Sequence, residues 1–105
     1  MQQALLTLIV SLELEETLVD WLLEQDHVQG FTSMQVYGHG SGVSAMSVAE
    51  QVQGRQKRTQ FMVHGQLSAL ERLLQDIRRQ YPRAGLHYFL TPVISAGPIA
   101  GESLE

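Results

Sequence analysis

The sequence changes its hydrophobic period within one segment, RTQFMVHGQLSALERLLQDIRRQYP, residues 58–82. Its first eight residues alternate in character, which is typical of a β-strand and predicts a strand that ends near Gly65. Ser68 and Glu71 then have the spacing of a capping box at a helix start, and Pro82 ends that helix. One buried stripe with i, i+3, i+4, i+7, i+11 spacing is predicted from Leu70, Leu73, Leu74, Ile77 and Tyr81.

A second strand-like segment, FTSMQVYG at residues 31–38, precedes this unit, and the two strands are expected to pair as a hairpin. Between them lies a long connection, residues 38–58. Loops beyond about 12 to 15 residues are uncommon in compact domains and are usually functional or disordered. Ser47 and Glu50 repeat the capping-box spacing, and Gly54 stands where a helix of two turns would end. We therefore expect a short helix within this connection. We also expect the connection as a whole to carry the function of the protein.

The outer segments complete the pattern. ALLTLIVSL, Ala4–Leu12, predicts a strand buried on both faces, and ELEETLVDWLLEQ, residues 13–25, predicts a helix. The apolar face of that helix is expected to hold Leu18, Val19, Leu22 and Leu23. AGLHYFLTPV, residues 84–93, predicts a fourth strand, in which Pro92 suits a sheet edge or strand end.

The order βαββαβ predicts an α+β, ferredoxin-like fold, because right-handed crossovers and short connections favour that closure. Its antiparallel four-stranded sheet would carry both helices on one face, in a single domain over residues 1–105 with a loose tail at 95–105. The other face would remain apolar and uncovered. Several residues or their alternating neighbours would lie there: Leu6, Leu8, Val10, Met62, Tyr88 and Leu90. A second subunit is the economical cover for such a face.

Composition excludes several classes of protein. The formal net charge of −4 argues against general nucleic-acid binding, which needs a broad basic face. The absence of cysteine excludes disulfides and cysteine-containing zinc sites. No segment approaches the roughly 20 apolar residues of a membrane span, and the first apolar run lacks a basic leader and a cleavage site, so a cytoplasmic location is predicted.

The chemistry-bearing residues are few. Arg55, Lys57 and Arg58 place three of the seven basic residues within four positions, which favours an anion site, or else protects a strand entrance from edge pairing. GHGSG, residues 38–42, lacks the spacing of a phosphate-binding loop. The four histidines have no local metal-ligand spacing, although His39 in the glycine-rich neck could bind a metal with ligands from other segments. No catalytic constellation is present, so an enzyme is not predicted.

Together the βαββαβ order, the uncovered sheet face and the long loop resemble the PII-like proteins, which are related to nitrogen regulatory proteins. YGHGSGVSAMSVAEQVQGRQKRTQFMVHG followed by YPRAGLHYFLTPV is similar to a PII-like subfamily encoded beside heavy-metal efflux systems. The resemblance covers Ala4 to Val93. It implies a homotrimer with inward-facing sheets, whose long "T-loop" senses a small ligand and engages a protein partner such as an efflux component.

One departure bears on the ligand. Signalling PII proteins hold ATP partly with a Gly- and Lys-containing loop before strand four, where this chain has only YPRAG, with Arg83 as its sole cation. An ATP motif is therefore not evident, and both a nucleotide and a divalent metal remain open as ligands. The candidate ligand- or partner-binding residues are His39, Arg55, Lys57, Arg58 and Arg83.

The predicted function is that of a trimeric, PII-like regulatory protein. One alternative is a CutA-like metal-tolerance or efflux accessory protein with His39 as a metal ligand. Another is a dimeric α+β-barrel enzyme, since such enzymes share this element order.

Overall fold

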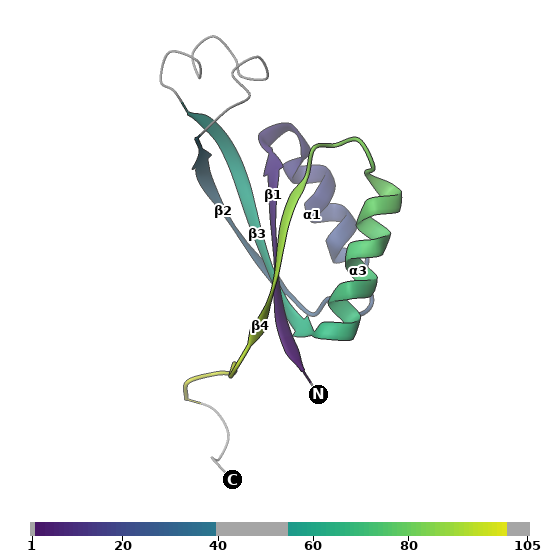
Figure 1. The fold of residues 1–105 in the computed structure, drawn as a ribbon, viewed down its shortest axis with the longest axis vertical. Helices are drawn as coiled ribbons and strands as arrows, with labels where there is room; N and C mark the ends of the chain where they lie inside the picture. Colours follow the sequence, from purple (N-terminus) through teal and green to yellow (C-terminus); the bar gives the residue numbers. More distant parts are fainter. Residues whose placement is uncertain (1, 40–54, 101–105) are drawn as a thin grey trace.

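A computed structural model describes residues 2–39 and 55–100 of the chain. The described elements form one antiparallel sheet with both helices on the same face (Figure 1). In chain order they are β1 (Gln3–Ser11), the 3₁₀-helix η1 (Leu12–Leu14), α1 (Glu15–Leu23), β2 (Phe31–Gly38), β3 (Gln56–Gln66), α3 (Leu67–Gln80) and β4 (His87–Val93). The predicted βαββαβ order and ferredoxin-like architecture are confirmed.

The strands lie in the order β2-β3-β1-β4, and every neighbouring pair is antiparallel. β1 is central, whereas β4 is an edge strand, which explains how Pro92 is tolerated in it. Because Ser11 pairs with Arg58 and Gly38 pairs with Gln56, the end of β1 and the base of the long connection lie at one end of the sheet. The start of β4 lies at that end too (Figure 1).

The core lies between the sheet and the two helices. Alternate residues of β1 are buried while their neighbours are only half-buried, so β1 has one covered face and one open face. Phe61 and Val63 of β3 extend the covered face beside β1. From the helices, the buried residues are Leu18, Leu22, Leu70, Leu73, Leu74 and Ile77. The predicted stripe of α3 is thus confirmed, with Tyr81 packed at its end.

Two polar or aromatic contacts join the helices to this core. Thr59 is buried, and its Oγ1 donates a hydrogen bond of 2.7 Å to Glu15 Oε1, which satisfies the hydroxyl. Trp21 packs edge-on against Tyr81, with ring centroids 6.1 Å apart, and both rings lie against the core. Burial, and secondly the nearby Glu24 carboxylate, raise the pKa of the Tyr81 phenol.

The predicted capping box at Ser68 and Glu71 is wrong. The helix begins at Leu67, and its N-cap is Gln66, two residues before Ser68, with no side-chain hydrogen bond there. The Leu67 amide instead donates to the Gln2 carbonyl oxygen at 2.8 Å. A backbone acceptor from the chain beside β3 therefore satisfies one of the free amides that a capping side chain would have served.

Three other boundaries and faces differ from the prediction. Leu23 is 68% exposed, because α1 directs only Leu18 and Leu22, one turn apart, fully into the core. β3 begins at Gln56, so the connection after β2 is residues 39–55. The hairpin is longer than its apolar residues suggest, because Lys57 and Gln56 pair with Tyr37 and Gly38. β4 begins at His87, because the preceding turn places Gly85 at a φ of 69°. The helix expected from Ser47 and Glu50 lies outside the described residues.

The open face of the sheet carries the alternating neighbours of the core residues. Leu6, Leu8 and Val10 are buried against the helices, which corrects their placement among candidates for the open face. The apolar residues of the open face are instead Leu5, Ile9, Met34, Val36, Met62, Phe89 and Val93. Tyr88 and Leu90, two further candidates for the open face, pair with Leu8 and Leu6 and so lie on the helix side, whereas Phe89 pairs with Thr7 on the open face. Within the described ranges, no helix has the length and apolar character needed to cross a membrane.

Candidate functional site

A cavity of about 530 Å³ lies on the open face at the base of the long connection. We call it the loop-base pocket; its lining includes Ile9, Val36, Gly38, His39, Arg58, His87 and Phe89. Strand pairing assembles it, because β2 and β3 pair up to Gly38 and Gln56, while β1 joins β3 to β4. The pocket therefore combines residues from all four strands, the residue after β2 and the turn before β4.

Arg58 supplies the positive charge of the pocket. Its Nη2 donates a hydrogen bond of 2.6 Å to Gln56 Oε1, across one position of the same strand. A guanidinium carries five N–H donors, so this bond leaves others to meet an anion. Gly38 lies close by, since a Cβ built on it would stand 3.8 Å from Arg58 Cγ. Among residues 2–39 and 55–100, no carboxylate contributes to the lining, and this described part of the pocket is a local cationic site on an acidic protein.

Two imidazoles complete the lining. His39 is exposed and directly follows β2. His87 is the first residue of β4 and lies on the open face of the sheet, where both imidazoles line the pocket. His87 packs edge-on against Phe89, with ring centroids 5.1 Å apart, which holds the imidazole beside the aromatic ring. An imidazole can donate to an anion or bind a metal, so the pair suits either ligand class.

Among the predicted site residues, His39 and Arg58 meet in the loop-base pocket, and the other three lie outside its lining. The Arg55 guanidinium lies over the Tyr37 ring, 4.1 Å from its centroid, so it is held beside the pocket by a cation–π contact. Lys57 is exposed and pairs with Tyr37 across the hairpin. Arg83 is exposed in the turn between α3 and β4, two residues before the pocket residue Gly85.

Sequence reasoning missed His87 as a site residue. The histidines lie far apart in the chain, and only the pairing of β4 with β1 brings His87 to the same end as His39. A usable signal was nevertheless present, because period-2 alternation puts His87 and Phe89 on one face of the strand. His64 lies elsewhere and has a side-chain partner, since its Nε2 is 2.5 Å from Gln3 Oε1. Over residues 2–39 and 55–100, no three potential metal ligands cluster.

Residues 1–100 match the family model described as "Protein of unknown function (DUF3240)". The chain belongs to the DUF3240 family. No curated protein is similar enough in sequence to match. The family of this DUF3240 protein is therefore known from the family model, and its fold can be compared with solved structures.

Several solved structures resemble this DUF3240 protein, and three of them illustrate the range. A DUF3240 family protein from Shewanella baltica OS155 has 18% identity and a TM-score of 0.75, covering 93% of this chain and 97% of that one. The nitrogen regulatory PII-like protein CPII from Thiomonas intermedia K12, bound to ADP, AMP and bicarbonate, has 18% identity and a TM-score of 0.68, covering 94% and 98%. The periplasmic divalent cation tolerance protein CutA from Archaeoglobus fulgidus has 10% identity and a TM-score of 0.65, covering 90% and 86%.

These similarities confirm the predicted PII-like fold of the DUF3240 protein. The fold is shared with a PII-like regulatory protein and with CutA, the two kinds of protein that the sequence pattern suggested. None of the three relatives is described as an enzyme. At 10 to 18% identity the likeness concerns the fold, so ligand and partner have to be argued from the residues of this chain.

Proposed function

We propose that this DUF3240 protein is a cytoplasmic, trimeric PII-like regulator that binds a small anion in the loop-base pocket and signals through the connection at 39–55. One observation carries the proposal: Arg58, His39 and His87 line a single pocket, and the described part of the chain places no carboxylate beside them. The pocket lies at the root of the connection, so a bound anion would contact residues on both of its flanks. The ligand would bias the conformations of that connection through such contacts.

The anion is proposed to be an adenosine nucleotide or bicarbonate. A protein of the same fold was solved with ADP, AMP and bicarbonate bound. A cavity of about 530 Å³ is within the usual size range of small-molecule sites, about 300 to 1,000 Å³. Arg58 would bind a phosphate or carbonate oxygen pair through its planar fork, and the imidazoles would donate further hydrogen bonds.

The trimer is proposed from the open face of the sheet. Met34 and Phe89 are each 52% exposed there, and Leu5 and Ile9 of the central strand lie between them and are only half-covered. Burying a few hundred Å² of such surface would stabilise an assembly by several kcal/mol, at about 25 cal/mol per Å². Packing of three sheets around a common axis would cover this face in every subunit.

Calorimetric titration of the full chain with ADP, AMP and bicarbonate tests the pocket. Arg58→Gln is expected to weaken anion binding about 10- to 100-fold, since a hydrogen bond to a charged group contributes about 1.5–3 kcal/mol. Arg72→Gln on the exposed face of α3 is the matched control, because it removes the same charge outside the pocket and should bind like the wild type. Equal binding by both variants would contradict the assignment of Arg58.

A metal-binding accessory role is the second candidate, favoured by the two imidazoles that line one pocket. The same titration with zinc, copper and nickel, on the wild type and on His39→Ala, separates the two candidates. Saturable metal binding that His39→Ala abolishes would replace the anion with a metal as the ligand. If none of the three metals gives a saturable heat of binding, the metal-binding role is ruled out.

Deletion of residues 41–54 tests the signalling role of the connection. Because the proposed trimer rests on the sheet, the deletion should leave the oligomer intact, as measured by sedimentation equilibrium. Capture of the protein partner from a lysate of the native host should be lost, because the partner would contact the connection. Unchanged capture by the deletion variant would remove the proposed role of this segment.

A further inference from the structure

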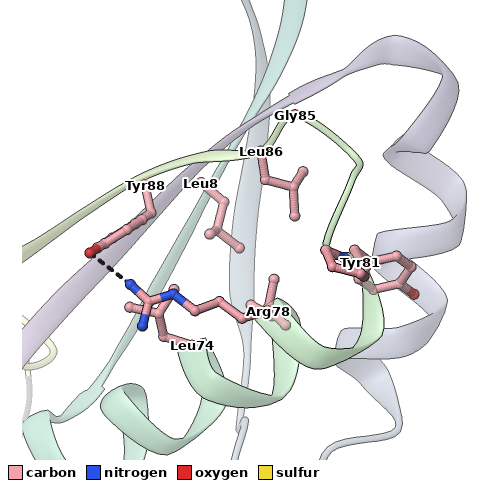
Figure 2. Close-up of a pocket in the computed structure, with 9 residues that line it drawn as sticks. Leu8, Leu74, Arg78, Tyr81, Gly85, Leu86 and Tyr88 are labelled. Atoms are coloured by element: carbon pink, nitrogen blue, oxygen red, sulfur yellow. Dashed lines mark hydrogen bonds between the residues drawn. The ribbon is translucent and has the colours of Figure 1, made fainter.

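A second hollow lies on the helix side of the sheet, between α3 and β4 (Figure 2). We call it the α3–β4 pocket; its volume is about 430 Å³, and its lining includes Leu8, Leu74, Ile77, Arg78, Leu86 and Tyr88. The loop-base pocket lies on the other face, since Tyr88 pairs with the core residue Leu8 whereas His87 and Phe89 pair with Ile9 and Thr7. The two hollows share Gly85, in the turn before β4, and their strand residues otherwise lie on opposite faces of the sheet.

The floor of the α3–β4 pocket is apolar. Leu8, Leu74 and Ile77 are buried beneath it, and Leu86 borders it from the chain just before β4. Figure 2 shows the side chains of Leu8, Leu74 and Leu86 gathered between the helix and the strand. Water in such a hollow finds few hydrogen-bond partners, so an apolar group that replaces it would bind favourably.

Two polar side chains lie together at the edge of this apolar floor. Arg78 Nη2 donates a hydrogen bond of 3.0 Å to the Tyr88 hydroxyl oxygen, and the guanidinium carbon lies 5.3 Å from the Tyr88 ring centroid (Figure 2). The Tyr88 hydroxyl accepts this bond and therefore keeps its own O–H as a donor. An N–H donor and an O–H donor thus stand side by side.

The charge of Arg78 is not neutralised by the described part of the chain. The next residue, Arg79, forms an ion pair with Asp76 on the same helix. Arg78 has no such pair among residues 2–39 and 55–100, and its side-chain partner there is Tyr88. A guanidinium with only a neutral partner, placed over an apolar floor, is complementary to an anion that carries an apolar body.

We propose that the α3–β4 pocket binds a small carboxylate with an aromatic or aliphatic body. The carboxylate would accept hydrogen bonds from Arg78 and from the Tyr88 hydroxyl, and the body would lie on Leu8, Leu74 and Leu86. This proposal does not depend on the loop-base pocket, because the two cavities lie on opposite faces of the sheet and use different cations.

Benzoate and its neutral isostere benzamide are the probes, titrated into the full chain and followed by NMR chemical shifts. Benzoate should bind saturably with a dissociation constant on the order of 1 mM, as is reasonable for a ligand of so few atoms. Shifts should concentrate on residues 74–88, and benzamide should bind at least about tenfold more weakly because it lacks the charge.

Arg78→Gln should weaken benzoate binding about 10- to 100-fold. Arg79→Gln is the matched control, since Arg79 is the next residue on α3, is also exposed and does not line the pocket; it should bind benzoate like the wild type. Equal affinity of benzoate and benzamide for the wild type would overturn the proposal without reference to any variant. Benzoate shifts located elsewhere, or equal losses in both variants, would overturn it as well.

Discussion

Leu5→Glu is expected to dissociate the proposed trimer into monomers or to precipitate the protein. Leu5 lies in the central strand, on the open face, paired with His64 on one side and Thr91 on the other. In the proposed assembly this position is covered by other subunits, so a carboxylate there would be removed from water. Effective penalties for such a charge are several kcal/mol, enough to prevent association at micromolar concentration.

Leu23→Glu is the matched control for this prediction. It makes the same substitution at a leucine that is 68% exposed on α1, so it should remain trimeric and soluble. His39→Ala, at the edge of the sheet, should also leave the assembly intact. Sedimentation equilibrium gives the oligomeric state, and circular dichroism checks that Leu5→Glu retains its fold. A trimeric Leu5→Glu protein, or a wild type that is monomeric at micromolar concentration, would refute the proposed assembly.

Phe61→Ala is expected to lower the free energy of unfolding by about 3 to 5 kcal/mol, the usual cost of truncating a buried phenylalanine. Phe61 is 0% exposed and lies in β3, where it pairs with Leu8 of the central strand. Its ring also lies 5.9 Å from that of Phe31, centroid to centroid. Removing the ring would leave a cavity at the centre of the sheet's covered face, and the neighbouring strands could not collapse to fill it.

Urea unfolding at one fixed protomer concentration measures this loss, because the stability of an oligomer depends on concentration. Gln35→Ala is the control: it is exposed on β2, opposite Thr59, and should change stability by less than about 0.5 kcal/mol. A loss at Phe61 no larger than that at Gln35 would mean that the covered face does not form the core in solution.

Much of this architecture was predictable because the evidence for it is local. The stripe of α3 follows from residues within four positions of one another, and the strand of Thr59, Phe61 and Val63 follows from alternation. Helix capping is different. The Leu67 amide donates a hydrogen bond to the carbonyl oxygen of Gln2, which is 65 residues away in the sequence. This acceptor replaces a local cap at Ser68, and the residues around Ser68 give no sign of it.

The candidate site was predictable only where a single segment held its residues. Arg58 and His39 were expected because each flanks the long connection, and both line the loop-base pocket. His87 was not expected, because its place depends on the register of β4 against β1. Arg55, which was also predicted as a binding residue, lies over Tyr37, and this contact could not be foreseen because it requires the two ends of the hairpin to meet.

Spacing along the chain was therefore sufficient for the element order, the helix stripe and the uncovered face, because each depends on a periodicity of 2 or 3.6 residues. Pairing between distant strands decided which apolar set faces the helices, since a shift of one residue would exchange the two faces. In this way Leu6, Leu8 and Val10 entered the core, and Leu5 and Ile9 were left on the open face. The same pairing assembled both pockets, whose residues come from segments that only the folded sheet brings together.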